Sequence, residues 1–188
     1  MLLVVADTSP IRYLVEIRHI GILPQLFERI FIPSVVYDEL RHPSAPATVR
    51  TWANSRPSWL EVLPVTVSDD PAFHALDDGE KSALTLGMAL GAELILIDDR
   101  KGAAAALRKG FQITGTLGLL TRSAQRGILD LADALTRLKQ TNFHYRQQLF
   151  DDILKNTRIA AMAKPAPWRR AERGAPRSVR WELHIGTD

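Results

Sequence analysis

Apolar positions along the chain follow two patterns: short runs that are apolar throughout, and longer segments with helical spacing. The runs are typical of strands buried on both faces. They predict five strands, at 2–6, 30–33, 59–65, 93–98 and 111–114. Helical spacing predicts helices at 10–19, 22–30, 35–42, 44–56, 79–91, 103–109, 116–126, 130–140 and 144–158, with a loop and a short helix at 69–78. This alternation predicts an α/β domain with a parallel sheet covered by helices on both faces.

Residues with known preferences for helix ends stand at several of these boundaries. We expect Ser34 and Thr116 to cap the helices that they precede, because a side-chain hydroxyl there can accept a hydrogen bond from a free backbone N–H. We expect Gly21, Gly91 and Gly110 to end helices, because glycine adopts the left-handed conformation without strain.

Acidic residues fall where the predicted strands end. Asp7 ends the first strand, Glu39 lies in the helix after the second, and Glu80 lies in the first turn of the helix before the fourth. Asp98 and Asp99 directly follow the fourth strand. In a doubly wound sheet the first strand is central, and a fourth strand returning beside it makes Asp7 and Asp98 neighbours. Glu39 and Glu80 then lean over the same edge of the sheet.

Each acid also has an ordinary structural explanation. Asp7 and one of Asp98 and Asp99 could cap helices, Glu39 could be solvated helix surface, and Glu80 could complement a helix dipole. The convergence of four separate placements on one sheet edge favours a site instead. Carboxylates that lie so close repel one another unless a proton or a cation neutralises them. Mg²⁺ and Mn²⁺ suit such oxygen donors, and they can activate water and stabilise the charge of a phosphodiester.

Composition limits the classes of protein that need to be considered. A chain of 188 residues with 46% hydrophobic and 24% charged residues is typical of one globular domain. No apolar run approaches the ~20 residues of a membrane helix, and the first residues lack the basic region of a signal peptide. We therefore expect a cytoplasmic protein that does not enter a membrane. The absence of cysteine excludes disulfides, thiolate nucleophiles and cysteine-based zinc sites.

The net charge of +3 resides entirely near the C-terminus. Residues 1–163 hold 18 basic and 18 acidic residues, whereas residues 164–188 hold six basic and three acidic ones. The charge therefore does not by itself indicate a nucleic-acid-binding face. The change of composition predicts a domain at 1–158, followed by a basic, Pro- and Arg-rich tail at 159–188.

The segments that carry the acids resemble PIN-domain proteins, and more narrowly the VapC-like toxin ribonucleases. The resemblance covers roughly residues 1–155 and rests on three stretches in order: "VVADTSPIRYL", "FERIFIPSVVYDEL" and "LDDGEKSALTLGMALGAELILIDDRKGAAAALRKGFQITGTLGLL". It implies a three-layer α/β sandwich with a five-stranded parallel sheet. It also implies Mg²⁺- or Mn²⁺-dependent cleavage of RNA, typically by the toxin of a toxin–antitoxin pair, with a small antitoxin protein as partner. We also expect a homodimer.

The resemblance assigns roles to particular residues. The family's first three acids fall on Asp7, Glu39 and Glu80. The fourth falls on Asp98 or Asp99, with Asp98 preferred for catalysis; the metal ligands would be Asp7, Glu80, Asp98 and Asp99. Thr8 and Ser9 would support the first acid, Ser9 by orienting Asp7 or a water molecule. Arg100 and Lys101 are candidates for contact with phosphate.

Two other interpretations are open. A catalytically weak binding module could keep this fold and chiefly pair with a protein partner. A receiver-like phosphotransfer domain also gathers acids at strand ends, but it needs a second acid near Asp7 and a lysine after the last strand, and "TGT" at 114–116 offers none.

Overall fold

The computed structural model describes residues 2–144, 148, 150–153 and 155. The tail predicted at 159–188 and most of the helix predicted at 144–158 lie outside these residues. The helices and strands are β1 (Val4–Ala6), α1 (Thr8–Glu16), η1 (Ile20–Ile22), α2 (Leu23–Leu26), β2 (Ile30–Pro33), α3 (Ser34–Arg41), α4 (Ala47–Ser55), β3 (Leu60–Leu63), η2 (Pro71–Phe73), α5 (Asp78–Leu90), β4 (Leu94–Leu96), α6 (Arg100–Arg108), β5 (Gln112–Thr114), α7 (Thr116–Gln125) and α8 (Leu131–Leu138).

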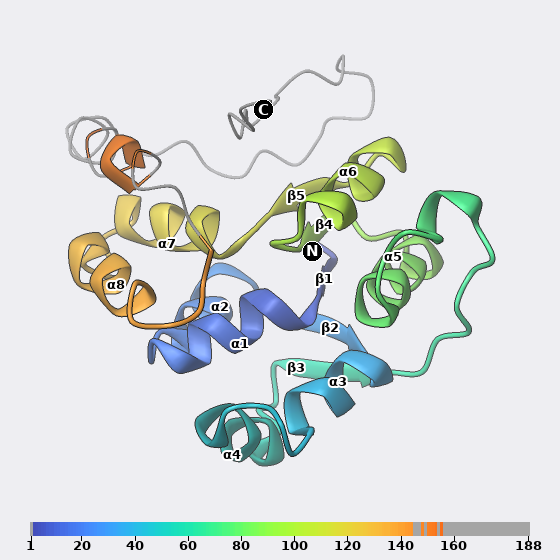
Figure 1. Ribbon diagram of the computed structural model, residues 1–188, viewed down its shortest axis with the longest axis horizontal. Helices are drawn as coiled ribbons and strands as arrows, with labels where there is room; N and C mark the ends of the chain where they lie inside the picture. Colours follow the sequence, from blue (N-terminus) through green and yellow to red (C-terminus); the bar gives the residue numbers. More distant parts are fainter. Residues whose placement is uncertain (1, 145–147, 149, 154, 156–188) are drawn as a thin grey trace.

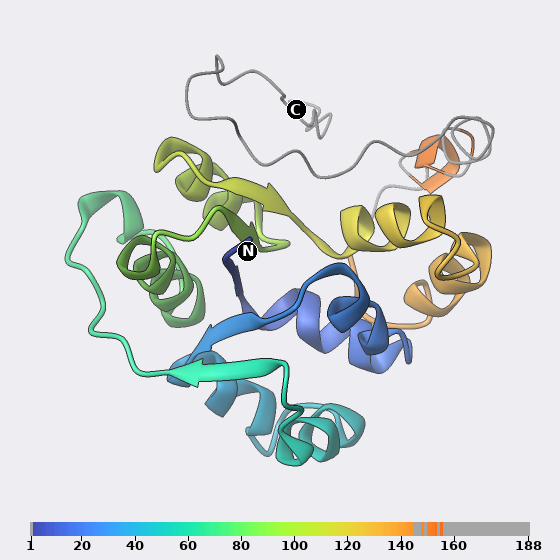
Figure 2. The same cartoon turned by 180° about the vertical axis from the view of Figure 1, so that it is seen from behind.

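The five strands form one parallel sheet in the order β3-β2-β1-β4-β5 (Figures 1 and 2). The predicted return of the fourth strand to the side of the first is confirmed, since Val4 pairs with Leu94 and Ala6 with Leu96. Strand order reverses between β1 and β4, and the carboxyl ends of strands at such a reversal are where open α/β sheets place ligands. Asp7 is held at that point, because its N–H donates to the carbonyl of Leu96 at 2.9 Å.

Each face of the sheet has its own hydrophobic core, because successive side chains along a strand point to opposite faces. Val4 and Ala6 of β1 pack with α1, α3, α7 and α8, whereas Val5 packs with α5 and α6. Figure 1 shows α5 to one side of the sheet and α1, α7 and α8 to the other. The result is the predicted single α/β domain of three layers with a five-stranded parallel sheet.

Several predicted helix ends are wrong in detail. α1 ends at Glu16, and Arg18 with a φ of 62° makes the turn that was expected at Gly21. The chain reverses earlier because the N–H of His19 bonds back to the carbonyl of Leu14 at 2.8 Å. Ser34 and Thr116 are the first residues of their helices and not the caps, which are Pro33 and Gly115.

The predicted ends at two other glycines are confirmed. Gly91 caps α5 in the left-handed conformation, with a φ of 63°. Gly110 directly follows the C-cap of α6, with a φ of 86°. Both helices therefore end where a residue without a side chain permits the turn into the next strand.

Candidate functional site

Asp7 occupies the turn between β1 and α1. Its backbone is extended and its side chain is 4% exposed. Asp7 is the N-cap residue of α1, although its carboxylate makes no capping hydrogen bond of normal geometry to that helix. Burial raises the pKa of Asp7 to about 7, although the nearby N–H of Thr8 opposes the rise, and the charges of Asp77 and Glu39 add to it.

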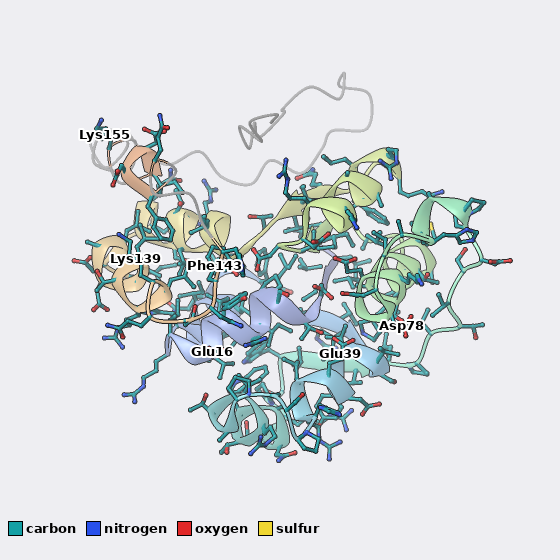
Figure 3. The ribbon with its side chains drawn as sticks, viewed as in Figure 1. Glu16, Glu39, Asp78, Lys139, Phe143 and Lys155 are labelled. Atoms are coloured by element: carbon teal, nitrogen blue, oxygen red, sulfur yellow. The ribbon has the colours of Figure 1, made fainter. Side chains whose placement is uncertain are left out.

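Glu39 lies on α3, the helix that follows the neighbouring strand β2, and it reaches the same place as Asp7. Its Oε2 accepts a hydrogen bond from the hydroxyl of Thr8, the residue next to Asp7. A Cβ atom at Gly79 would lie 2.9 Å from Glu39 Oε2 and 3.2 Å from Asp7 Oδ1, so both carboxylates crowd the backbone of α5. Figure 3 shows Glu39 on α3 and Asp78 at the start of α5, on adjoining elements. Burial raises the pKa of Glu39, and the charge of Asp77 adds to it.

Glu80 is fixed in the first turn of α5 by a reciprocal capping box. Its N–H donates to Asp77 Oδ1 at 2.8 Å, and its own Oε2 accepts the N–H of Asp77 at 3.2 Å. The side chain is 4% exposed. Burial raises the pKa of Glu80 to about 8, and the charges of Asp77, Asp99 and Asp7 contribute. Glu80 is therefore an interior carboxyl with other acids around it.

The two aspartates after β4 point to different places. Asp98 Oδ1 accepts the N–H of Thr116 at 2.7 Å, and Oδ2 accepts the Thr116 hydroxyl at 2.6 Å, which ties β4 to the start of α7. Burial raises the pKa of Asp98 to about 6, against the effect of these hydrogen bonds. Asp99 is exposed and caps α6, where its Oδ1 accepts the N–H of Lys101 at 2.6 Å and of Gly102 at 3.1 Å.

Asp99 is the aspartate that lies beside Glu80. Burial alone would raise the pKa of Asp99, but the N–H groups of the first turn of α6 and the Glu80 carboxyl together hold it below its usual value. A Cβ atom at Gly102 would lie 3.1 Å from Glu80 Oε1, so glycine there leaves room for the Glu80 carboxyl. The two pKa values move apart because burial dominates at Glu80, whereas hydrogen bonds dominate at Asp99.

A comparison with protein families identifies the family of this chain. The family model for the PIN domain matches residues 3–158, which is most of the chain. The chain belongs to the PIN domain family. PIN domains are generally nucleases and typically bind divalent metals. Comparisons with curated proteins and with solved structures gave no significant match. None of the described helices is long and apolar enough to span a membrane.

The residues that were predicted to support the first acid or to contact phosphate lie around the same edge. Thr8 links the first and second acids through its bond to Glu39. Ser9 is half-buried in the first turn of α1. Arg100 and Lys101 are exposed in the first turn of α6, next to Asp99. Neither cation forms an ion pair with a described residue, so both are available to an incoming anion.

The electrostatics of this edge come from acids and helix termini rather than from ion pairs. Among the described residues no lysine, arginine or histidine forms an ion pair with Asp7, Glu39, Glu80 or Asp98. Instead α1, α5, α6 and α7 all begin here, and the partial positive charge of a helix N-terminus favours carboxylates in its first turn. Burial and the neighbouring acids nevertheless raise the pKa values of Asp7 and Glu80.

The donor set fits a hard divalent cation in chemistry. The part of the chain that the structure describes has no ready group of three or more acidic or histidine side chains that could hold a metal ion. The carboxylates approach in two pairs instead, Asp7 with Glu39 against Gly79 and Glu80 with Asp99 near Gly102. All donors are oxygen atoms, which Mg²⁺ and Mn²⁺ prefer. A cation here would favour the charged carboxylates, against the burial and the mutual repulsion that raise their pKa values.

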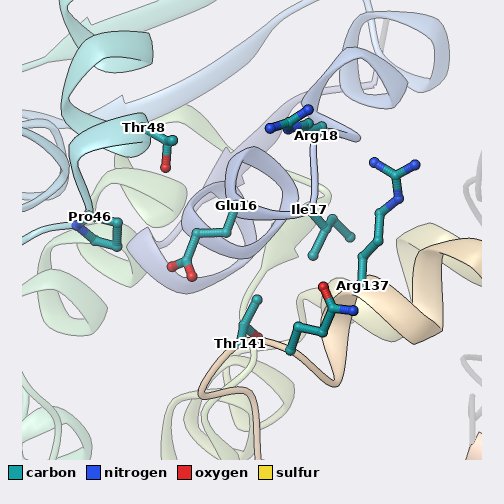
Figure 4. A pocket seen from close by; sticks show the side chains of 8 residues that line it. Glu16, Ile17, Arg18, Pro46, Thr48, Arg137 and Thr141 are labelled. Atoms are coloured by element: carbon teal, nitrogen blue, oxygen red, sulfur yellow. The ribbon is translucent and has the colours of Figure 1, made fainter.

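Two of the hollows on the surface of the described residues lie close to α1 and α3. The smaller, of about 390 Å³, adjoins the acids and is lined by Val35, Asp38, Glu39, His42 and Ser44. The larger, of about 530 Å³, lies at the far end of α1 from Asp7 (Figure 4). Its lining consists of Glu16, Ile17, Arg18, Pro46, Thr48, Arg137, Gln140 and Thr141.

Sequence reasoning missed one acid and one hydroxyl of this region. Asp77 is the charge that acts on Asp7, Glu39 and Glu80 alike. Its spacing of three residues before Glu80 is a capping-box signature that could have revealed it. Thr116, expected as a helix cap, instead holds Asp98. Nothing in the local pattern indicates that contact, because the two residues meet only through pairing of β4 with β5.

Proposed function

We propose that this PIN domain is a divalent-metal-dependent endoribonuclease. The observation that carries the proposal is the gathering of Asp7, Glu39 and Glu80 at the carboxyl end of the central strands without a cationic partner among the described residues. A fold has no structural reason to bury acids that repel one another. A cation-binding site gives that arrangement a use, as does a reaction that develops negative charge on phosphate.

Each residue has a role that follows from its position. Asp7 and Glu80, which are almost fully buried, would hold Mg²⁺ or Mn²⁺ together with an aspartate after β4. The bound ion would supply an activated water and charge stabilisation at the phosphodiester. Glu39, held by Thr8 and half-buried, can accept a proton from water. Arg100 and Lys101 are exposed at the rim, where they can bind phosphates of the RNA strand.

The aspartate after β4 that holds the ion is open to assignment. The resemblance to VapC-like proteins favours Asp98, which is half-buried and committed to Thr116. Geometry favours Asp99, which lies beside Glu80. The two can be ranked by calorimetric titration of single variants with Mn²⁺.

The decisive test is cleavage of RNA by the purified chain. Incubation of labelled single-stranded and structured RNA with Mg²⁺ or Mn²⁺ should give defined fragments, and excess EDTA should stop their formation. The Asp7→Asn variant should be inactive while its circular dichroism spectrum matches that of the wild type. Failure of the wild type to cleave either kind of RNA in the presence of both metals would overturn the proposal.

The resemblance to VapC-like proteins supports a narrower proposal, that the nuclease is the toxin of a toxin–antitoxin pair. A small antitoxin would lay an apolar segment among the early helices, around residues 11–26 and 35–40, with an arginine or lysine directed at the acids. Induced expression in a bacterial host should arrest growth, and Asp7→Asn should not. We also propose a homodimer, for which ultracentrifugation is the test.

One observation favours a second candidate. Since the described residues do not present three metal-holding side chains at once, the chain could serve chiefly as a binding module for a protein partner. That candidate predicts tight partner binding with no Mn²⁺ uptake near Asp7. Calorimetry with Mn²⁺ alone separates the two functions.

A further inference from the structure

The smaller hollow is a groove along the exposed side of α3, next to the acids. Val35, Asp38, Glu39 and His42 line it at positions i, i+3, i+4 and i+7, which lie on one face of a helix. Its volume of about 390 Å³ is within the range of sites for small organic groups. Glu39 belongs both to this groove and to the acidic site. An RNA strand that is bound at the acids therefore has this groove directly beside it.

The loop after α3 fixes which ring nitrogen carries the proton when the His42 ring is neutral. The backbone N–H of Ser44 donates to His42 Nδ1 at 3.2 Å, and the Ser44 hydroxyl lies 2.6 Å from the same atom. A backbone N–H can only donate, so Nδ1 is an acceptor and the proton of the neutral ring is on Nε2. No hydrogen bond to Nε2 is formed by the residues that the structure describes. The groove is thus provided with one N–H donor.

Asp38 provides the complementary acceptor. It is exposed and lies four residues before His42, so the two side chains are neighbours on the helix surface. Within the described ranges Asp38 forms no ion pair. The nearest arginine along α3, Arg41, is turned away to Asn54 and to the ring of Tyr37. The groove therefore offers an unpaired carboxylate beside an imidazole N–H and the apolar surface of Val35.

This combination excludes phosphate and fits a base. Asp38 and Glu39 repel the phosphates of the strand, whereas a flat apolar ring can lie against Val35. An unpaired base exposes its Watson–Crick edge to protein side chains. Guanine presents two adjacent donors, N1–H and the 2-amino group, beside the O6 acceptor. A carboxylate can take both donors while an imidazole N–H bonds to O6; adenine, cytosine and uracil each lack part of this pattern.

We propose that the groove of Val35, Asp38 and His42 binds an unpaired guanine next to the cleaved phosphodiester. The proposal rests on the endoribonuclease function above and names the nucleotide that this site selects. Asp38 would accept from the guanine N–H groups and His42 Nε2 would donate to O6. Selection therefore requires single-stranded RNA, because pairing hides the edge that the groove contacts.

The test compares four fluorescein-labelled uridine dodecamers, with guanosine, adenosine, cytidine or uridine at the seventh position. Binding is measured by fluorescence anisotropy in EDTA, and cleavage by denaturing gels in Mn²⁺. We expect the wild type to bind the guanosine oligomer about tenfold more tightly than the others, and to cut within one nucleotide of the guanosine. Annealing to a complementary strand should remove the preference.

Three variants separate the outcomes. Asp38→Asn and His42→Gln should each reduce the guanosine preference at least about threefold, while Glu28→Gln, an exposed acid outside the groove, should leave it unchanged. If Asp38→Asn does not give the wild-type circular dichroism spectrum, His42→Gln carries the test.

Cleavage without base preference, or a preference that survives both groove variants, would overturn the guanine site and leave the nuclease function standing. Absence of cleavage of any oligomer by the wild type would instead remove the proposed function itself.

Discussion

The acids near the two ends of α1 differ in whether basic side chains pair with them. At the C-terminal end acids are paired with cations: Arg12 Nε lies 2.7 Å from Glu16 Oε1, and Arg137 Nε lies 2.8 Å from Asp133 Oδ2. At the N-terminal end Asp7, Glu39 and Glu80 have no such partner among the described residues, and their pKa values are raised. The larger hollow lies at the C-terminal end of α1, and the uncompensated acids lie at its N-terminal end. Missing charge compensation, rather than the size of a cavity, identifies the candidate site.

The difference has a physical basis in the sheet. At the C-terminal end of α1, Glu16 and Asp133 each pair with an arginine four residues away on their own helix, α1 and α8. The carboxyl edge of the sheet collects acids from four separate connections, and among the described residues no lysine, arginine or histidine forms an ion pair with Asp7, Glu39, Glu80 or Asp98. Acids without ion-pair partners suit a site that must accept a cation, because the cation would otherwise have to displace an arginine that already pairs with them.

The largest effect is expected from removing the charge at the uncompensated end. Asp7→Asn keeps the shape of the side chain but removes its charge, and should lower RNA cleavage at least ~10²-fold. Glu16→Gln, the matched change at the compensated end, should leave cleavage within about twofold of wild type. Rates of RNA cleavage with matched circular dichroism spectra measure both. Similar losses in the two variants would contradict the contrast between the two ends.

The second prediction concerns the stability of the metal-free protein. The pKa of Asp7 rises from 3.8 to about 7 and that of Glu80 from 4.5 to about 8 on folding. Between about pH 4 and pH 8 the folded state therefore holds protons that the unfolded state has released. The stability that these two carboxyl groups contribute is fully present below their pKa values in the unfolded state. It is lost as the pH rises through their pKa values in the folded state. In EDTA, the Tm should fall steadily over this range.

Two additions sharpen that measurement. Mn²⁺ should raise the Tm more at pH 8 than at pH 6, because protons compete less for the carboxylates. Asp7→Asn in EDTA should unfold at a higher temperature than the wild type at pH 8, since a neutral amide is less costly to bury than a carboxylate. A Tm that rises with pH in EDTA would show that the acids are compensated after all.

A smaller effect separates the neighbouring aspartates after β4. Asp99→Asn should weaken Mn²⁺ binding more than Asp98→Asn does, because Asp99 lies beside Glu80. Asp98→Ala should instead lower stability by about 1–2 kcal/mol, since it removes both hydrogen bonds to Thr116. Calorimetric titration with Mn²⁺ and thermal unfolding of each variant provide the two readouts. The reverse order of Mn²⁺ affinities would restore Asp98, the choice that the sequence favoured, as the ligand.

These aspartates also mark the limit of what the sequence could predict. The strand order and the placement of Asp7 followed from apolar runs and from the rules of parallel sheets, because burial patterns are local. The side-chain directions of Asp98 and Asp99 did not follow, because they depend on α7 and α6, which reach the same edge from elsewhere in the chain. The turn at Arg18 was missed for a different reason: local backbone hydrogen bonds to Leu14 and Val15 close it at a residue type that seldom adopts a positive φ.

The smallest effect is expected at Asp77, whose cap and charge can be separated. Asp77→Ser keeps a hydroxyl that can accept the Glu80 N–H and should cost only a few tenths of a kcal/mol, whereas Asp77→Ala should cost about 1 kcal/mol. Because both changes remove a negative charge near Glu80, both should flatten the fall of Tm with pH. Thermal unfolding at pH 5 and pH 8 tests this. Equal slopes in wild type and Asp77→Ser would mean that the charge of Asp77 does not reach the site.

Crystals of the full chain soaked in Mn²⁺ at about pH 8 test the central claim most directly, by the anomalous scattering of the metal. We expect an anomalous peak at the carboxyl edge of the sheet, from an ion bound by the carboxylates of Asp7 and Glu80, and no peak in the hollow near Glu16. A map without a peak at Asp7, from crystals that take up Mn²⁺ elsewhere or not at all, would contradict the assignment of this acidic edge as a metal-dependent site.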